Sequence, residues 1–264
     1  TTTDLATIVE RMKLFQPDEI LYVVDKRQEL HFIQVFRCAR KTGLVEEDTR
    51  LSFLGFGTMN GKDGKPFKTR EGGVMRLENL IADIDEEMFT KIVENRSVRD
   101  KDARDTAKIV GLAAIKYGDL SNQATKDYIF DVDRFTSFEG NTGPYILYTI
   151  VRIKSILNRY VEAGGNLEAG EILPASNGSE KNLMLQLSGF GSMIESAFEE
   201  KAPHKICAYI YEVSNAFNSF YHETKILSEE NQAQKESYIR LLQLTKRVLE
   251  TSIDLLGFEA PDKM

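Results

Sequence analysis

The sequence has no apolar run long enough to cross a membrane and no secretion signal at its N-terminus. A membrane helix needs about 18 or more consecutive apolar residues, and a signal peptide places positive charge before an apolar stretch. Neither pattern occurs, so we expect no membrane partner. The first residue is Thr1 rather than Met, so we expect that the chain begins inside a longer protein.

Cysteine and histidine are scarce. Cys38 and Cys207 lie far apart, each within an apolar-periodic run. They are predicted to be buried thiols of a reducing compartment, which favours the cytoplasm. His31, His204 and His222 are equally scattered. Because no metal-ligand spacing links them, we predict no protein metal site.

Net positive charge is also lacking, since 34 Lys and Arg residues face 41 Asp and Glu residues, for a net charge of −7. This balance argues against a surface that binds nucleic acid everywhere, but it is compatible with a local basic strip. The length of 264 residues, with 42% hydrophobic and 28% charged side chains, is typical of a soluble globular protein of one large or two ordinary domains.

The first 75 residues alternate between helical and strand patterns. Apolar spacing predicts helices over 4–15 and 28–40, and short β-branched and aromatic runs predict strands at Ile20–Val24 and Leu51–Phe56. This order indicates a βαβ-type parallel sheet. Functional residues of such sheets lie at the carboxyl ends of the strands.

From about Met75 onward the apolar spacing is helical throughout, and no strand is predicted. The expected helices cover about 76–94, 101–117, 126–135, 143–162, 180–200, 203–223 and 230–257. Ala163–Ser179, rich in Gly, Asn and Ser, is expected to be a loop. The predicted fold class is therefore α/β followed by all-α, with one domain over 1–100 and a helical bundle over 101–264.

A glycine-rich, basic loop follows the second strand, over Gly57–Gly73. Its five glycines and four cations can present positive charge and backbone N–H groups to phosphates. It is not a Walker A loop, because no Gly-Lys-Ser/Thr stands at the required spacing. Composition alone favours the alternative of a basic hairpin without a ligand.

The order of residues in this loop carries a resemblance. Lys-Pro-Phe-Lys-Thr-Arg-Glu-Gly-Gly, followed by Met75-Arg-Leu-Glu-Asn-Leu-Ile, resembles the modified KMSKS loop of class I arginyl-tRNA synthetases. The resemblance implies that Lys68, Thr69 and Arg70 are catalytic residues beside the ATP phosphates, with Lys68 and Arg70 binding the nucleotide. They would stabilise charge on the pyrophosphate as the arginine carboxylate attacks the α-phosphorus.

Two further segments resemble the arginine-binding motifs of this family. Tyr22–Gln34 matches Tyr-Val-x-x-x-x-Gln-x-x-His, which implies that Gln28 contacts arginine and that His31 lies nearer the nucleotide. Thr1–Ala6 matches a segment whose Asp, here Asp4, pairs with the substrate guanidinium. If the family resemblance is left aside, Gln28 is predicted to be a solvent-facing residue, His31 a packed histidine and Asp4 a helix N-cap.

The region from Tyr117 to Arg152 resembles the opening of the synthetase's helical anticodon-binding domain. The helix after the turn at Gly140–Pro144 presents Tyr145, Tyr148 and Arg152 at spacings that share one face. We expect Tyr148 and Arg152 to face tRNA and Tyr145 to be a core residue. The alternative is that the tyrosines only build the core.

The C-terminal part resembles the same domain. Tyr221, in Phe220-Tyr-His222, matches a tyrosine that the family places at the anticodon loop, and Met264 matches the family's last residue. Both are therefore implied to bind tRNA. One departure is Val132, where relatives carry Trp, and this change is expected to affect packing rather than function.

The resemblance implies a partial, Rossmann-like catalytic lobe joined to an anticodon-binding domain. The implied reaction activates arginine with ATP, accompanied by Mg²⁺, and transfers it to arginine tRNA; we expect a monomer. No HIGH-type motif occurs in these residues, so the chain alone is not expected to complete the reaction. The alternatives are a non-catalytic tRNA-binding module with a vestigial α/β lobe, or a metabolite-binding regulator that uses the glycine loop.

Overall fold

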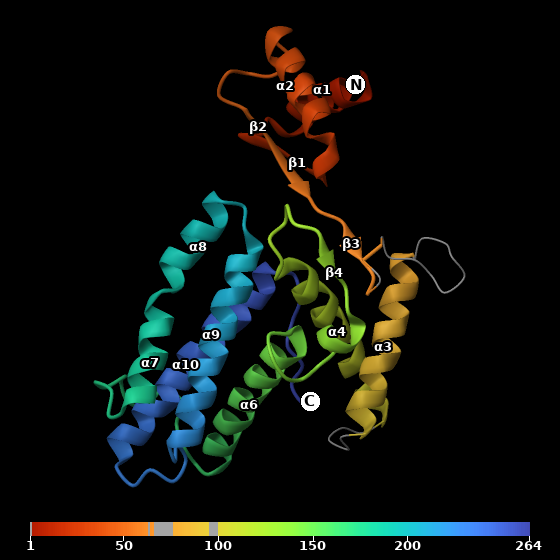
Figure 1. Ribbon diagram of the computed structural model, residues 1–264. Coiled ribbons are helices and arrows are strands. Elements are labelled where there is room, and N and C mark those ends of the chain that lie inside the picture. Colours follow the sequence, from red (N-terminus) through yellow and green to blue (C-terminus); the bar gives the residue numbers. More distant parts are fainter. Residues whose placement is uncertain (1, 63, 66–75, 95–99) are drawn as a thin grey trace. The chain divides into compact units, whose positions relative to one another are not determined.

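The computed structural model describes residues 2–62, 64–65, 76–94 and 100–264, which form two compact units (Figure 1). Unit 1 comprises Thr1–Phe67 and Gln123–Ile129, and unit 2 comprises Lys68–Asn122 and Phe130–Met264. The α/β character of the first and the helical character of the second agree with the predicted fold class. The functional boundary that we predict between residues 100 and 101 stays a prediction.

Unit 1 is built around two parallel strands, joined by a helix as the sequence predicts. Its elements are α1 (Thr2–Phe15), β1 (Glu19–Asp25), a 3₁₀ turn η1 (Lys26–Gln28), α2 (Glu29–Lys41), β2 (Arg50–Phe56), β3 (Met59–Asn60) and β4 (Tyr128–Ile129). β1 and β2 pair in parallel from Glu19↔Arg50 to Asp25↔Phe56. The carboxyl ends of both strands therefore lie side by side.

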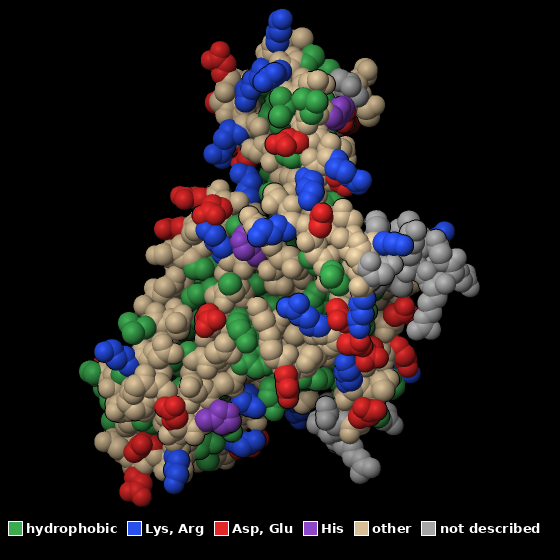
Figure 2. All heavy atoms as spheres, in the orientation of Figure 1, with side chains coloured by type: hydrophobic (Ala, Val, Ile, Leu, Met, Phe, Trp, Pro, Cys, Tyr) green, Lys and Arg blue, Asp and Glu red, His purple; other side chains and the backbone are tan. Residues whose placement is uncertain are grey.

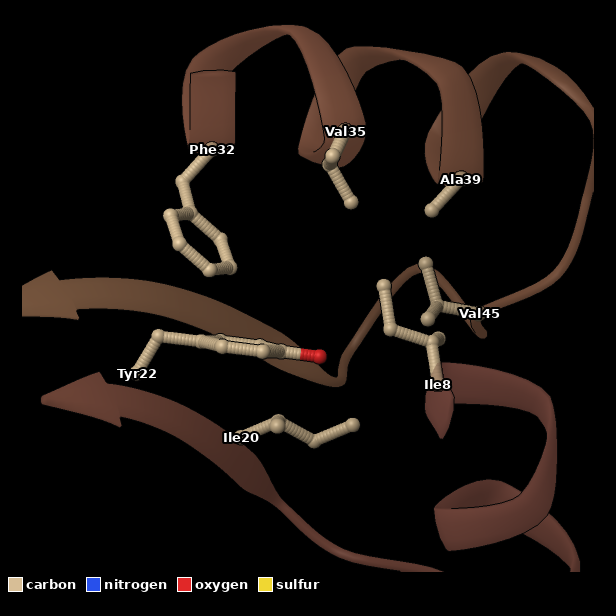
Figure 3. Packing of buried hydrophobic residues seen from close by; sticks show 7 residues of the cluster. All are labelled: Ile8, Ile20, Tyr22, Phe32, Val35, Ala39 and Val45. Atoms are coloured by element: carbon tan, nitrogen blue, oxygen red, sulfur yellow. The ribbon is translucent and has the colours of Figure 1, made fainter. Parts of the chain in front are cut away.

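A small apolar core holds the helices of unit 1 to one face of β1 (Figure 3). The residues come from α1, β1, α2 and the following loop: Ile8, Ile20, Tyr22, Phe32, Val35, Ala39 and Val45. β1 alternates, because Ile20 and Tyr22 are buried whereas Leu21 and Val23 are 38% and 55% exposed. The apolar strand is therefore covered on one face by the described residues.

Unit 2 is a bundle of helices in which α6, α9 and α10 lie side by side and α3 packs against α4 (Figure 1). Its helices are α3 (Leu77–Glu94), α4 (Asp100–Leu120), α5 (Val132–Phe135), α6 (Gly143–Glu162), α7 (Gly178–Ser188), α8 (Phe190–Glu199), α9 (Pro203–Glu223) and α10 (Gln232–Leu255). Within the described residues, no helix combines the length and the apolar content that crossing a membrane needs.

Two helix predictions were wrong. The expected helix over 126–135 is a strand, β4, followed by the short helix α5. The Asp131 side chain accepts hydrogen bonds from the N–H groups of Asp133 and Arg134, so the helix starts only after it. The expected helix over 180–200 is two helices, α7 and α8, which meet at Gly189.

The two cysteines differ in burial. Cys207 is buried as predicted, and burial raises the pKa of its thiol to about 12. Cys38 is only half-buried, on α2, so the prediction that both thiols are buried was wrong for this residue. Both thiols are free.

Segment 123–129 joins unit 1 by backbone contacts that need a glycine at position 57. The N–H of Gly57 donates to the carbonyl of Ala124 at 2.8 Å, and the N–H of Tyr128 donates to the carbonyl of Thr58 at 3.1 Å. A Cβ on Gly57 would lie 2.3 Å from the carbonyl oxygen of Lys126. The close approach therefore excludes any side chain at this position.

We expect Gly57→Ala to separate segment 123–129 from the rest of unit 1. The new methyl group clashes with backbone, and overpacking of this kind costs about 1–3 kcal/mol. Hydrogen exchange of the Gly57 and Tyr128 amides measures the separation, and both should exchange faster in the variant. Gly178→Ala is the matched control, because a Cβ there meets open space. Equal exchange in the two variants would contradict this reading.

Candidate functional site

Asp4 and His31 form a pair at one end of unit 1. Asp4 lies in the first turn of α1, and His31 lies in the first turn of α2. The His31 Nε2 atom is 2.9 Å from Asp4 Oδ2. The hydrogen bond from His31 is the main cause that holds the pKa of Asp4 below 3.8. Since α1 begins at Thr2, Asp4 lies inside the helix, and its interpretation as an N-cap was wrong.

Gln28 lies one turn before His31, where the 3₁₀ turn meets α2. Its side chain is exposed and makes no capping bond within the described part of the chain. The turn itself is fixed by Asp25, whose Oδ1 accepts from the backbone N–H of Arg27 at 2.8 Å and whose Oδ2 pairs with Arg27 Nη2 at 2.6 Å. These bonds from Arg27 lower the pKa of Asp25 to about 2. The exposed Gln28 amide thus follows a turn that is stabilised by the bonds between Asp25 and Arg27.

The start of the glycine-rich loop is tied to the same turn. Asp127 Oδ1 accepts from the N–H of Thr58 at 2.7 Å and from Lys26 Nζ at 2.9 Å. Lys26 Nζ also donates to the carbonyl of Thr125 at 3.2 Å. The backbone bond from Thr58, and then Lys26, lower the pKa of Asp127. The predicted catalytic residues of this loop, residues 68–70, lie outside the described residues.

In unit 2, Arg152 lies against two tyrosine rings. Its guanidinium carbon is 4.7 Å from the ring centre of Tyr148 and 5.2 Å from that of Tyr221, which are cation–π distances. Tyr148 is 42% exposed, and Tyr221 stacks on Phe217 with a centroid distance of 6.0 Å. The fold therefore brings together three of the residues predicted to bind RNA, from α6 and α9.

Tyr145 is half-buried rather than fully buried. Its ring lies 5.7 Å from that of Tyr211, and its hydroxyl donates to Asn215 at 2.8 Å. Burial raises the pKa of the Tyr145 hydroxyl. The prediction of a core tyrosine was therefore wrong: the ring lies near that of Tyr211, but the residue is half-buried and its hydroxyl belongs to a polar network.

Within the described part of the chain, Met264 follows a C-terminal segment that is held on α6 by Lys154 and not by Arg152. Lys154 Nζ donates to the carbonyls of Ala260 and Pro261, each at 3.3 Å, and lies 3.6 Å from Glu250 Oε1. Lys154 and Arg152 are two residues apart, or about 200° around the helix axis. The anchor of the C-terminal segment is therefore on the side of α6 away from Arg152.

Several contacts around these sites were missed by sequence reasoning. Asp127 and Lys26 are 101 positions apart, and Lys154 and Ala260 are 106 apart. Asp127 stands in a recognised motif, but nothing in a single sequence pairs it with a lysine of the first strand-end turn. Such partners become visible only when the fold is known.

Two further features of the site concern its charged side chains and its possible metal ligands. On the face drawn in Figure 2, Lys and Arg side chains are interspersed with Asp and Glu over the helical unit. Among the residues that the structure describes, no group of three or more His, Cys, Asp or Glu could hold a metal ion.

Comparison with known proteins identifies the family. A family model described as "tRNA synthetases class I (R), catalytic domain" matches residues 1–132, half of the chain. The chain belongs to this family of class I synthetases. A second model, the DALR anticodon binding domain, matches residues 146–264. The synthetase family resemblance seen in the motifs is thus confirmed.

Individual proteins similar to this chain belong to the same family. Curated arginine–tRNA ligases of Agathobacter rectalis and Alkaliphilus oremlandii are 66% and 59% identical to this chain over all of its length. The chain spans 45% of each relative. The crystal structure of an arginyl-tRNA synthetase from Plasmodium falciparum superimposes with a TM-score of 0.83 at 26% identity, covering 99% of this chain and 44% of the other.

The Asp4–His31 pair makes a testable prediction about pH. A carboxylate whose pKa is depressed by folding stabilises the fold above its unfolded value of about 3.9, and the stabilisation is lost as pH falls through the folded value. His31→Ala removes the donor that lowers the pKa of Asp4 most, so this pKa should rise toward 3.8. Carboxyl-carbon NMR titration measures it. Asp25 is the internal control, because its partner is Arg27; an unshifted Asp4 would contradict the assignment.

Proposed function

We propose that this chain is the C-terminal half of an arginine–tRNA ligase. The ligase activates arginine with ATP to arginyl-adenylate and transfers the arginyl group to its cognate tRNA. The observation that carries the proposal is that a catalytic-domain model and an anticodon-binding model match one chain in this order. The partners are then arginine, ATP with Mg²⁺ as its counter-ion, and arginine tRNA. We further propose a monomer that acts in the cytoplasm.

Asp4 and Gln28 are proposed to bind the arginine substrate. Asp4 has a depressed pKa and is therefore an anion at neutral pH, which suits a guanidinium. His31 occupies Oδ2 of Asp4, but each carboxylate oxygen has two lone pairs, so a guanidinium can share the carboxylate with it. His31 is thus proposed to orient Asp4, in addition to its predicted position near the nucleotide.

Lys68, Thr69 and Arg70 are proposed to stabilise the ATP phosphates. In the first step the arginine carboxylate oxygen bonds to the α-phosphorus and the bond to pyrophosphate breaks. Negative charge grows on the leaving pyrophosphate, so cations and hydroxyl donors aimed at it lower the barrier. The support is the motif order, together with a loop that starts at Thr58, where Asp127 fixes the backbone.

Tyr148, Arg152, Tyr221 and Met264 are proposed to bind tRNA. Aromatic rings beside a guanidinium can stack on unpaired bases while the cation meets base edges or phosphates. Three of the four side chains already form one cluster. Met264 is proposed on the family motif alone, and it follows a segment that is anchored by Lys154.

A non-catalytic tRNA-binding module with a vestigial α/β lobe is the second candidate. The two candidates predict different behaviour of the protein in which this chain occurs, since only the ligase forms arginyl-adenylate.

We expect Arg152→Ala and Tyr221→Ala to weaken binding of arginine tRNA at least about fivefold, because stacking one base on an aromatic ring is worth about 1–3 kcal/mol. Fluorescence anisotropy at several salt concentrations measures this. Arg247→Ala is the matched control, since Arg247 is exposed on α10. Unchanged affinity at every salt concentration would rule out the assignment.

We expect the purified 264-residue chain to show no arginine-dependent ATP–pyrophosphate exchange, because the motif that holds the triphosphate is not among its residues. The full-length protein should catalyse the exchange, and Lys68→Ala together with Arg70→Ala in it should lower the rate at least about a hundredfold, the scale on which losing one transition-state charge contact lowers kcat. Exchange by the 264-residue chain would disprove the first expectation. A full-length protein without exchange would favour the non-catalytic module.

A further inference from the structure

A directional chain of hydrogen bonds joins α6 to α9 beside Arg152. The Tyr145 hydroxyl donates to Asn215 Oδ1 at 2.8 Å and accepts from Asn218 Nδ2 at 2.9 Å. Asn218 Oδ1 in turn accepts from Arg152 Nη1 at 2.7 Å. The last member of the chain is thus the guanidinium that lies against two tyrosine rings.

The chemistry of the partners allows one orientation of the Asn218 amide. A guanidinium only donates, so it must face the amide oxygen. The Tyr145 oxygen gives its proton to Asn215 and therefore accepts from the amide NH₂. No other side chain of this size offers one acceptor and one donor in this arrangement: Asp lacks the donor, and Leu lacks both.

The bond to Asn218 restricts a side chain that is otherwise long and flexible. Arg152 has five N–H donors, and Asn218 uses one of them, so four are left for other contacts. One N–H group of the guanidinium is bonded to Asn218, and its carbon lies over the rings of Tyr148 and Tyr221, so the group is restrained by three neighbours. Immobilising a free side chain of this kind on binding costs about two- to tenfold in affinity.

We propose that Asn218 is a positioning residue for RNA recognition. It holds the Arg152 guanidinium in its binding geometry before RNA arrives, while Tyr145 and Asn215 hold Asn218. The inference rests on the proposed function, because it assigns Arg152 to tRNA. Asn218 itself is half-buried and acts through Arg152 rather than through contact with RNA.

A purely structural role is the competing explanation, since the same bonds also tie α6 to α9. The two helices are in contact with each other, and both also carry fully buried apolar residues, among them Ile150 of α6 and Phe217 of α9. Loss of the Asn218 bonds therefore leaves an apolar interface in place. A positioning role and a structural role can then be separated by whether the effect of Asn218 depends on Arg152.

The test is a double-mutant cycle in the 264-residue chain with fluorescein-labelled arginine tRNA. Asn218→Leu should raise Kd about two- to tenfold in the wild-type background and leave it unchanged in the Arg152→Ala background. Asn182→Leu, the same change at an exposed position of α7, should leave Kd unchanged in both. Equal effects of Asn218→Leu in both backgrounds, or no effect in either, would overturn the proposal.

A spectroscopic measurement tests the same point without RNA. In the free protein the signal of the Arg152 Nη1 group, which donates to Asn218, should be resolved and slow to exchange with solvent, and Asn218→Leu should abolish this protection. Asn215→Ala, one bond further from Arg152, is the second variant if Asn218→Leu does not fold, and it should weaken the protection. An Arg152 signal that is unprotected in the wild-type chain would contradict a preformed guanidinium.

The outcomes separate this inference from the proposed function. If the wild-type chain binds no arginine tRNA, the assignment of the helical unit to tRNA fails and the inference fails with it. If the chain binds tRNA and Arg152→Ala weakens binding, but Asn218→Leu acts equally in both backgrounds, only the role of Asn218 is overturned.

Discussion

Burial of the apolar side of α6 is the interaction on which the helical unit depends. Ile146, Ile150 and Ile153 are fully buried, and α6 packs against α4, α9 and α10. Fully burying one such side chain stabilises the fold by about 1.5–3 kcal/mol, so rotating the helix would be costly. The direction in which Tyr148 and Arg152 point is therefore set by the core. The element that builds the bundle also presents its proposed RNA-binding surface.

In unit 1 the corresponding constraint is the parallel pairing of β1 and β2. It brings two strand ends together, and the groups proposed for catalysis follow those ends: Gln28 after β1 and the glycine-rich loop after β2. The Asp127 carboxylate then fixes both segments by bonding Thr58 and Lys26. Asp127 belongs to a segment that lies between α4 and α5 in the sequence. Its bonds to the rest of unit 1 explain why this segment, with the short strand β4, is part of the α/β unit.

Elements that are determined by neighbouring residues could be predicted from the sequence, whereas contacts between residues far apart in the sequence could not. The helix at 143–162 was predicted to the residue, because its signals are local: apolar residues at helical spacing and a proline in the first turn. β4 was missed because Tyr128 forms a strand only by pairing with a segment almost 70 residues earlier. For the same reason motif order identified Asp4 and His31 separately, but only the fold shows that they are bonded.

If the helical unit holds the anticodon arm through the cluster at Arg152, chemical footprinting of arginine tRNA with the 264-residue chain should show protection of anticodon-loop nucleotides. Arg152→Ala should remove that protection, and a tRNA for another amino acid should be protected more weakly. Protection confined to the acceptor end, or equal protection by the wild-type chain and the Arg152→Ala variant, would contradict this role of the cluster.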